Sequence, residues 1–89
     1  MKHYHIEVTD LFCGEMNYSF IRRFNTTAKS ERGAMQKLSR HTGLNWRKYC
    51  DDGDGAIYHT TSKLSGAYVQ EYELNVGEDG IHNVYAEVI

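Results

Sequence analysis

Histidine and cysteine are the residue types of this sequence that most readily suggest a metal site, because imidazole and thiolate bind zinc. His3 and His5 are spaced to share one face of a β-strand, and Cys13, Cys50 or His59 would have to complete a tetrahedral site. The sequence contains neither a C-x-x-C nor an H-x-x-x-H pair, the short motifs from which zinc sites are usually built. We therefore predict no metal and no cofactor, and strand histidines that face solvent.

Nucleophilic catalysis would require Cys13 or Cys50 beside His41 or His59 and a carboxylate. Many folded chains that contain these residue types permit such a grouping, so a flanking motif must carry the assignment, and none is present. The sequence also lacks a glycine-rich phosphate-binding motif. We predict a protein that is not an enzyme.

Aromatic and basic side chains form the stronger candidate site, because Tyr, Trp and Arg dominate the hot spots of protein interfaces. The predicted binding residues are Tyr18, Arg22, Arg23, Trp46 and Tyr49. We expect the partner to be a host protein or protein complex. Single-stranded nucleic acid is the alternative, since bases stack on aromatic rings and phosphates pair with cations, but an isoelectric point near 6.2 is low for that class.

Charge is divided unevenly along the chain. Residues 1–50 carry nine Lys/Arg and four Asp/Glu, whereas residues 51–89 carry one Lys and eight Asp/Glu, so the net charge of −2 conceals a basic half and an acidic half. One interpretation is that the halves attract each other within one fold; the other is that one face is presented to a charged partner. An acidic patch that occupies the phosphate-reading groove of another protein is a further possibility.

The N-terminal half has the pattern of a strand hairpin followed by a helix. His3–Thr9 alternates apolar and polar residues, which predicts a half-buried strand, and Asn17–Thr26 is a second strand joined to it by a loop over Asp10–Met16. The apolar face of the first strand consists of Tyr4, Ile6 and Val8. In the second strand, Arg22 would share a face with two phenylalanines, so either its charge reaches out to water or a bulge at Arg22-Arg23 changes the register.

The helix is predicted over Glu31–Thr42, with Ser30 as its N-cap and Gly43 as the left-handed residue that ends it. The next segment, Leu44–Tyr49, is expected to be held against the fold by Leu44, Trp46 and Tyr49, in a conformation that the pattern does not define. Asp51–Gly55 is interpreted as an acidic turn. A calcium loop starting there would need a Glu at its twelfth position, which is Ser62.

Three more strands are predicted, over Ala56–Thr61, Ala67–Val76 and Ile81–Val88, the last two joined by a hairpin turn at Gly77–Gly80. The order is therefore ββαβββ. We predict one α+β domain over residues 1–89, in which one helix packs on one face of an antiparallel β-sheet.

Location and assembly follow from what the sequence lacks. There is no apolar run near the ~20 residues of a membrane helix and no signal-peptide pattern, so we expect a cytoplasmic protein without membrane contact. In that reducing compartment Cys13 and Cys50 are expected to be free thiols. A monomer and a homodimer formed through a sheet edge are both compatible with the sequence.

Several segments resemble a family of small uncharacterised proteins encoded by phages and plasmids. The resemblance rests on GEMNYSFIRR at residues 14–23, RGA at 32–34, WRKY at 46–49, GD at 53–54 and GAYV at 66–69. It covers most of the chain and carries no catalytic motif. In size and one-helix layout the chain is also similar to several anti-CRISPR proteins. The resemblance implies an accessory protein that binds and inhibits a host nucleic-acid-handling complex, of the anti-CRISPR or anti-restriction type.

Overall fold

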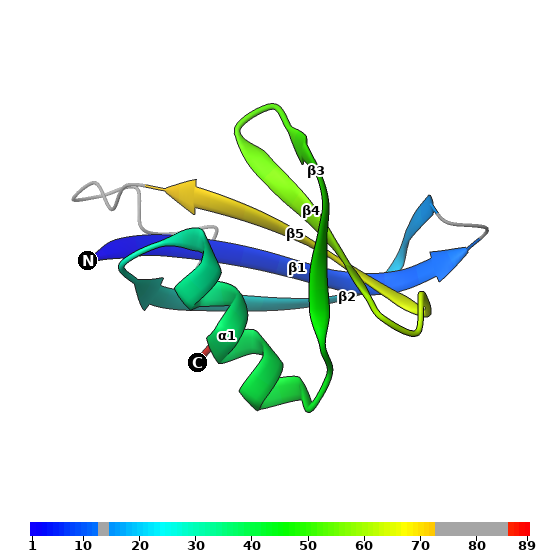
Figure 1. The fold of residues 1–89 in the computed structure, drawn as a ribbon, viewed down its shortest axis with the longest axis horizontal. Helices are drawn as coiled ribbons and strands as arrows, with labels where there is room; N and C mark the ends of the chain where they lie inside the picture. Colours follow the sequence, from blue (N-terminus) through cyan, green and yellow to red (C-terminus); the bar gives the residue numbers. More distant parts are fainter. Residues whose placement is uncertain (13–14, 73–85) are drawn as a thin grey trace.

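A computed structural model describes residues 1–12, 15–72 and 86–89. These residues form one helix and six strands: β1 (Lys2–Phe12), β2 (Glu15–Ala28), α1 (Glu31–Thr42), β3 (Trp46–Asp52), β4 (Gly55–Thr60), β5 (Ser65–Tyr72) and β6 (Glu87–Val88). The strands form a single sheet in the order β3-β4-β5-β1-β2-β6, and α1 crosses one face of it (Figure 1). The predicted α+β class with one helix is confirmed.

Two features of the sheet differ from the prediction. The sheet is mixed, because β6 pairs in parallel with β2, whereas the other described pairings are antiparallel. In addition, the segment after the helix is a strand, β3, which the sequence pattern did not reveal. The predicted turn at Gly77–Gly80 lies outside the described residues.

The hairpin of β1 and β2 continues through most of the segment predicted as a loop. Its register shifts between Thr9, which lies opposite Ile21, and Asp10, which lies opposite Asn17. The irregularity thus precedes Arg22 and does not fall at Arg22-Arg23. Arg22 keeps the face of Phe24 and is exposed, with its guanidinium carbon 5.1 Å from the centre of that ring. Of the two interpretations, the one in which the charge reaches water is confirmed.

The core lies between α1 and the facing side of the sheet. Its largest fully buried side chains are Phe24, Ile6, Leu38 and Val69. The helix has the predicted limits: the Gly33 N–H donates to the Ser30 hydroxyl oxygen at 3.2 Å, and Gly43 ends the helix at a φ of 72°, which glycine adopts without steric cost. These caps and the buried helix residues Ala34, Met35 and Leu38 fix how α1 lies across the sheet.

The opposite side of the sheet contains a buried polar pair. His5 is only 6% exposed, and its Nδ1 donates a 2.7 Å hydrogen bond to Oδ1 of Asn25, the residue directly opposite in β2. The prediction that the strand histidines face solvent is therefore wrong for His5. The physical reason is that Asn25 supplies the hydrogen bond that a buried imidazole needs.

Candidate binding surface

Strand β3 forms an edge of the sheet and pairs with β4 on one side only, within the described part of the chain. Six of its seven residues are exposed. The prediction that Leu44, Trp46 and Tyr49 together hold this segment against the fold is wrong for two of them, since Leu44 is 40% and Tyr49 66% exposed. Only Trp46 packs against the core. In the hairpin of β3 and β4, strand β3 therefore presents side chains of both faces and one strand edge to solvent, whereas one face of β4 is buried.

On the face of this hairpin opposite α1 is a concave region that we call the outer hollow. It has a volume of about 420 Å³ and is lined by Arg47, Lys48, Tyr49, His59, Thr60, Thr61 and Lys63. The register of β3 shifts between Lys48 and Cys50, and the Tyr49 ring stacks on His59, with 4.2 Å between ring centres and 15° between the planes. A stacked pair of rings, exposed at Tyr49 and half-buried at His59, thus lies among cations.

Lys63, at the rim of the outer hollow, has an unusual backbone. Its φ of 61° is in the left-handed region, where a residue with a Cβ is strained, and its N–H donates to the Thr60 carbonyl at 2.9 Å. Glycine would adopt this turn conformation at lower cost.

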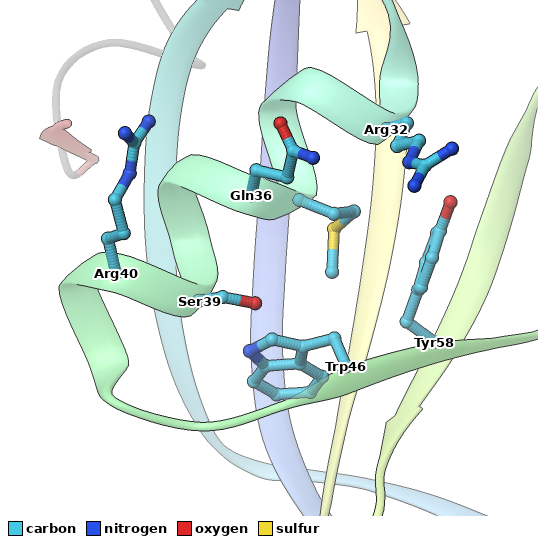
Figure 2. A pocket seen from close by; sticks show the side chains of 7 residues that line it. Arg32, Gln36, Ser39, Arg40, Trp46 and Tyr58 are labelled. Carbon is cyan, nitrogen blue, oxygen red and sulfur yellow. The ribbon is translucent and has the colours of Figure 1, made fainter.

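On the other face, between α1 and the strands β3 and β4, lies a groove of about 500 Å³, which we call the helix groove (Figure 2). Its lining residues are Arg32, Met35, Gln36, Ser39, Arg40, Trp46 and Tyr58. The indole N–H of Trp46 donates to the Thr42 hydroxyl at 3.3 Å, which ties the start of β3 to the end of α1. Aromatic rings thus lie at the base of the groove, and arginines come from the helix.

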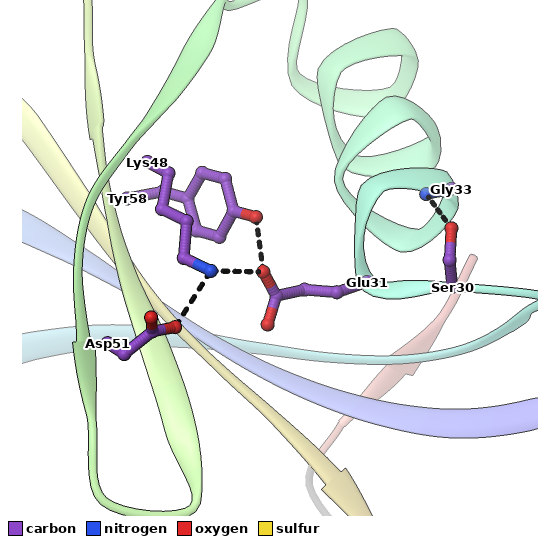
Figure 3. Close-up of polar contacts among 6 residues, drawn as sticks. All are labelled: Ser30, Glu31, Gly33, Lys48, Asp51 and Tyr58. Atoms are coloured by element: carbon purple, nitrogen blue, oxygen red, sulfur yellow. Dashed lines mark hydrogen bonds and ion pairs between the residues drawn. The ribbon is translucent and has the colours of Figure 1, made fainter.

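A polar network joins the start of α1 to the hairpin (Figure 3). The Tyr58 hydroxyl donates a 2.6 Å hydrogen bond to Glu31 Oε2, and Lys48 Nζ lies 3.4 Å from the same oxygen and 2.7 Å from Asp51 Oδ1. Burial, followed by the hydrogen bond to Glu31, raises the pKa of Tyr58 well above the ordinary tyrosine value. The network holds the two sides of the helix groove in a fixed relation.

Ion pairs among the described residues join the basic and the acidic half of the sequence at a few points. Three described pairs join the halves, namely Lys2 with Glu71 at 3.8 Å, His41 with Glu87 at 3.3 Å, and Lys48 with Asp51 at 2.7 Å. The other seven Lys and Arg side chains form no ion pair with any described carboxylate: Arg22, Lys29, Arg32, Lys37, Arg40, Arg47 and Lys63. Five of these seven lie on α1 or the β3–β4 hairpin and its following turn, so this end of the molecule carries positive charge that no described carboxylate pairs with.

The structure separates the predicted binding residues into two groups. Trp46 and Tyr49 both belong to β3, but Trp46 lines the helix groove and Tyr49 the outer hollow. Arg22 and Arg23 lie on β2, four strand spacings away, or about 19 Å across the sheet. Arg23 is paired with Glu7 at 3.1 Å. Tyr18 is also in β2, and its side chain lies outside the described residues.

Sequence reasoning did not assign His59 and Lys63 to the binding surface. His59 had a signal, because alternation along β4 places it on the face opposite the buried Tyr58. Its stacking partner, Tyr49, could not be predicted, because the sequence pattern did not show that Trp46–Asp52 forms a strand. Lys63 had no signal, since left-handed backbone at a lysine is not visible in a sequence.

Other chemistry is sparse in the described part of the chain. It contains no group of three or more His, Cys, Asp or Glu side chains that could hold a metal ion. Cys50 is a free, exposed thiol, and Cys13 lies outside the described residues. No described helix combines the length and the apolar character needed to cross a membrane.

Comparison with known proteins gives no match, whether with family models, curated proteins or solved structures. The resemblance to phage and plasmid accessory proteins stays a prediction from the sequence motifs. Functional inference therefore depends on the geometry of this chain's own residues.

Proposed function

We propose that this chain is a non-enzymatic accessory protein of the phage type that binds a host protein complex acting on nucleic acid and blocks it. The observation that supports this proposal is the open edge of β3, where six of seven residues are exposed and no described strand pairs with the outer side. An exposed edge offers unpaired N–H and C=O groups to which a strand of another protein can add. Inhibition follows from occlusion of the partner's working surface.

The side chains beside this edge have the composition of a protein-binding hot spot. Tyr49 exposes 66% of its surface, and Arg47 has no described carboxylate to neutralise it. Tyr and Arg bind with large contact areas and directional hydrogen bonds, and they are enriched among residues whose truncation costs more than ~2 kcal/mol of binding. Arg47 requires an acidic group on the partner, which supplies specificity.

A second candidate function, binding of single-stranded nucleic acid, is favoured by the outer hollow. The Tyr49 and His59 rings are stacked nearly parallel, and Arg47 and Lys63 line the same concave region. A base can extend such a stack, while the cations neutralise the adjoining phosphates. Binding of this kind would weaken steeply as the salt concentration rises.

A pull-down distinguishes the two candidates. Tagged protein is incubated with host lysate, with and without nuclease, and bound proteins are identified by mass spectrometry. We expect to recover a stoichiometric protein of a nucleic-acid-handling complex, and we expect its recovery to survive nuclease treatment. The Arg47→Ala/Tyr49→Ala double variant should lose this protein. The control Lys29→Ala, at an exposed position between β2 and α1, should retain it. Retention by the double variant would disprove the hairpin as the interface. Recovery of nuclease-sensitive material alone would favour nucleic-acid binding.

A further inference from the structure

The two aromatic residues of the helix groove present apolar rings because their polar atoms are already engaged. The Trp46 indole N–H donates to Thr42, and the Tyr58 hydroxyl donates to Glu31. The indole ring and the phenol ring therefore line the groove together with Met35, beside the Ser39 hydroxyl and the Gln36 amide of α1 (Figure 2). The two rings accept an apolar side chain without leaving the Trp46 or Tyr58 donor unpaired.

The rim of the groove carries two arginines, Arg32 and Arg40. Arg32 and Arg40 are eight residues apart on α1, a rise of about 12 Å along the helix axis. Neither guanidinium forms an ion pair with a described carboxylate. Glu31 lies beside the groove, but its Oε2 already accepts from Tyr58 and pairs with Lys48. Both arginines are therefore available to an acidic ligand.

We infer that the helix groove binds an extended segment of the partner protein in which two carboxylates are four residues apart and an apolar residue lies midway between them. In an extended chain, residues i, i+2 and i+4 share one face, and four residues span about 13 Å, close to the separation of Arg32 and Arg40 along the helix. The carboxylates pair with these arginines, and the apolar side chain enters between Met35 and Trp46. This inference rests on the proposed function and adds the chemistry of the partner.

The experiment uses Trp46, the only tryptophan of the chain, as an internal fluorescent probe at the base of the groove. The full-length protein is titrated with a synthetic peptide containing Asp-Ser-Leu-Ser-Asp, capped at both ends. Two matched peptides carry Asn in place of both Asp residues, or Ser in place of Leu. We expect a saturable change in Trp46 emission with the first peptide and clearly weaker binding of the other two.

Variants test the arginines directly. Arg32→Ala and Arg40→Ala are each expected to weaken binding of the acidic peptide about two- to five-fold, as for exposed charge pairs, and Lys29→Ala should leave it unchanged. Since Arg32 and Arg40 are exposed, circular dichroism should show that these variants keep the fold.

Three results would overturn the inference: no emission change with the acidic peptide, equal binding of the Asn peptide, or equal binding by the two arginine variants. A titration with oligo-dT serves as the other arm, and a response to oligo-dT that depends on Arg32 would assign the groove to nucleic acid instead. If the acidic peptide does not bind but capture of the host protein still depends on Arg47 and Tyr49, only the ligand inferred for the helix groove is disproved. If the Arg47→Ala/Tyr49→Ala double variant captures the host protein as well as the wild type does, the proposed function itself is contradicted.

Discussion

Replacement of Tyr58 by Phe removes one hydrogen-bond donor at the junction of α1 and the hairpin while it keeps the ring that lines the helix groove. The hydroxyl donates at 2.6 Å to Glu31, and hydrogen bonds to charged groups contribute about 1.5–3 kcal/mol. Glu31 retains a third of its side-chain exposure and its pairing with Lys48, so water and Lys48 compensate the carboxylate in part. We therefore expect the lower end of the range, a loss of about 1.5 kcal/mol in the free energy of unfolding.

The loss should be visible by thermal and chemical unfolding. For a domain of this size, 1.5 kcal/mol corresponds to a fall in Tm of about 6–12 °C. The matched control is Tyr49→Phe, the same chemical change on the neighbouring strand, where the hydroxyl has no hydrogen bond to a described residue. We expect the control to change stability by less than about 0.5 kcal/mol.

The pH dependence gives a second measurement of the same contact. The folded state raises the pKa of Tyr58 above its ordinary value of 10.0, so its contribution to stability is complete below about pH 10 and is lost as the pH rises further. Because the variant has no phenol to ionise at this position, it should lose less stability than the wild type between neutral pH and about pH 11. A Tyr58→Phe protein as stable as the wild type, with the same alkaline decline, would refute the role assigned to this network.

Three further substitutions test other parts of the structure. Leu38→Ala should lower the free energy of unfolding by about 3 kcal/mol in a urea titration, because the side chain is fully buried and leaves a cavity; a loss below about 1 kcal/mol would contradict its place in the core. Gly43→Ala should cost about 1 kcal/mol by the same assay, since φ is 72°, and an unchanged midpoint would argue against the left-handed cap. Lys63→Gly should keep or raise Tm by relief of its positive φ while it weakens partner capture, and unaffected capture would remove Lys63 from the binding surface.

The helix and the first hairpin could be predicted because their signals are local. Ser30 and Gly43 cap the helix by hydrogen bonds to residues three or four positions away. The alternation of Tyr4, Ile6 and Val8 with polar residues indicates which side of β1 faces the core. The same alternation gave the wrong environment for His5, because a buried polar pair with Asn25 depends on a residue twenty positions away.

Strand β3 could not be predicted because an edge strand exposed on both faces carries no hydrophobic period. The register shift around Tyr49 further interrupts the alternation that a strand normally shows. Missing β3 also hid the candidate site, since Tyr49 reaches His59 only through the pairing of β3 with β4. The separation of Arg22 and Arg23 from Trp46 likewise depends on strand order, which is set by long-range pairing.

The most direct test of the β3 edge as the protein interface is amide hydrogen exchange of the full chain with and without the partner protein recovered from nuclease-treated lysate. We expect slower exchange of those backbone amides of Trp46–Asp52 that point away from β4, because a partner strand would pair with this open side. Unchanged exchange in Trp46–Asp52, with protection confined to the segment around Arg22 and Arg23 of β2, would contradict the proposed interface.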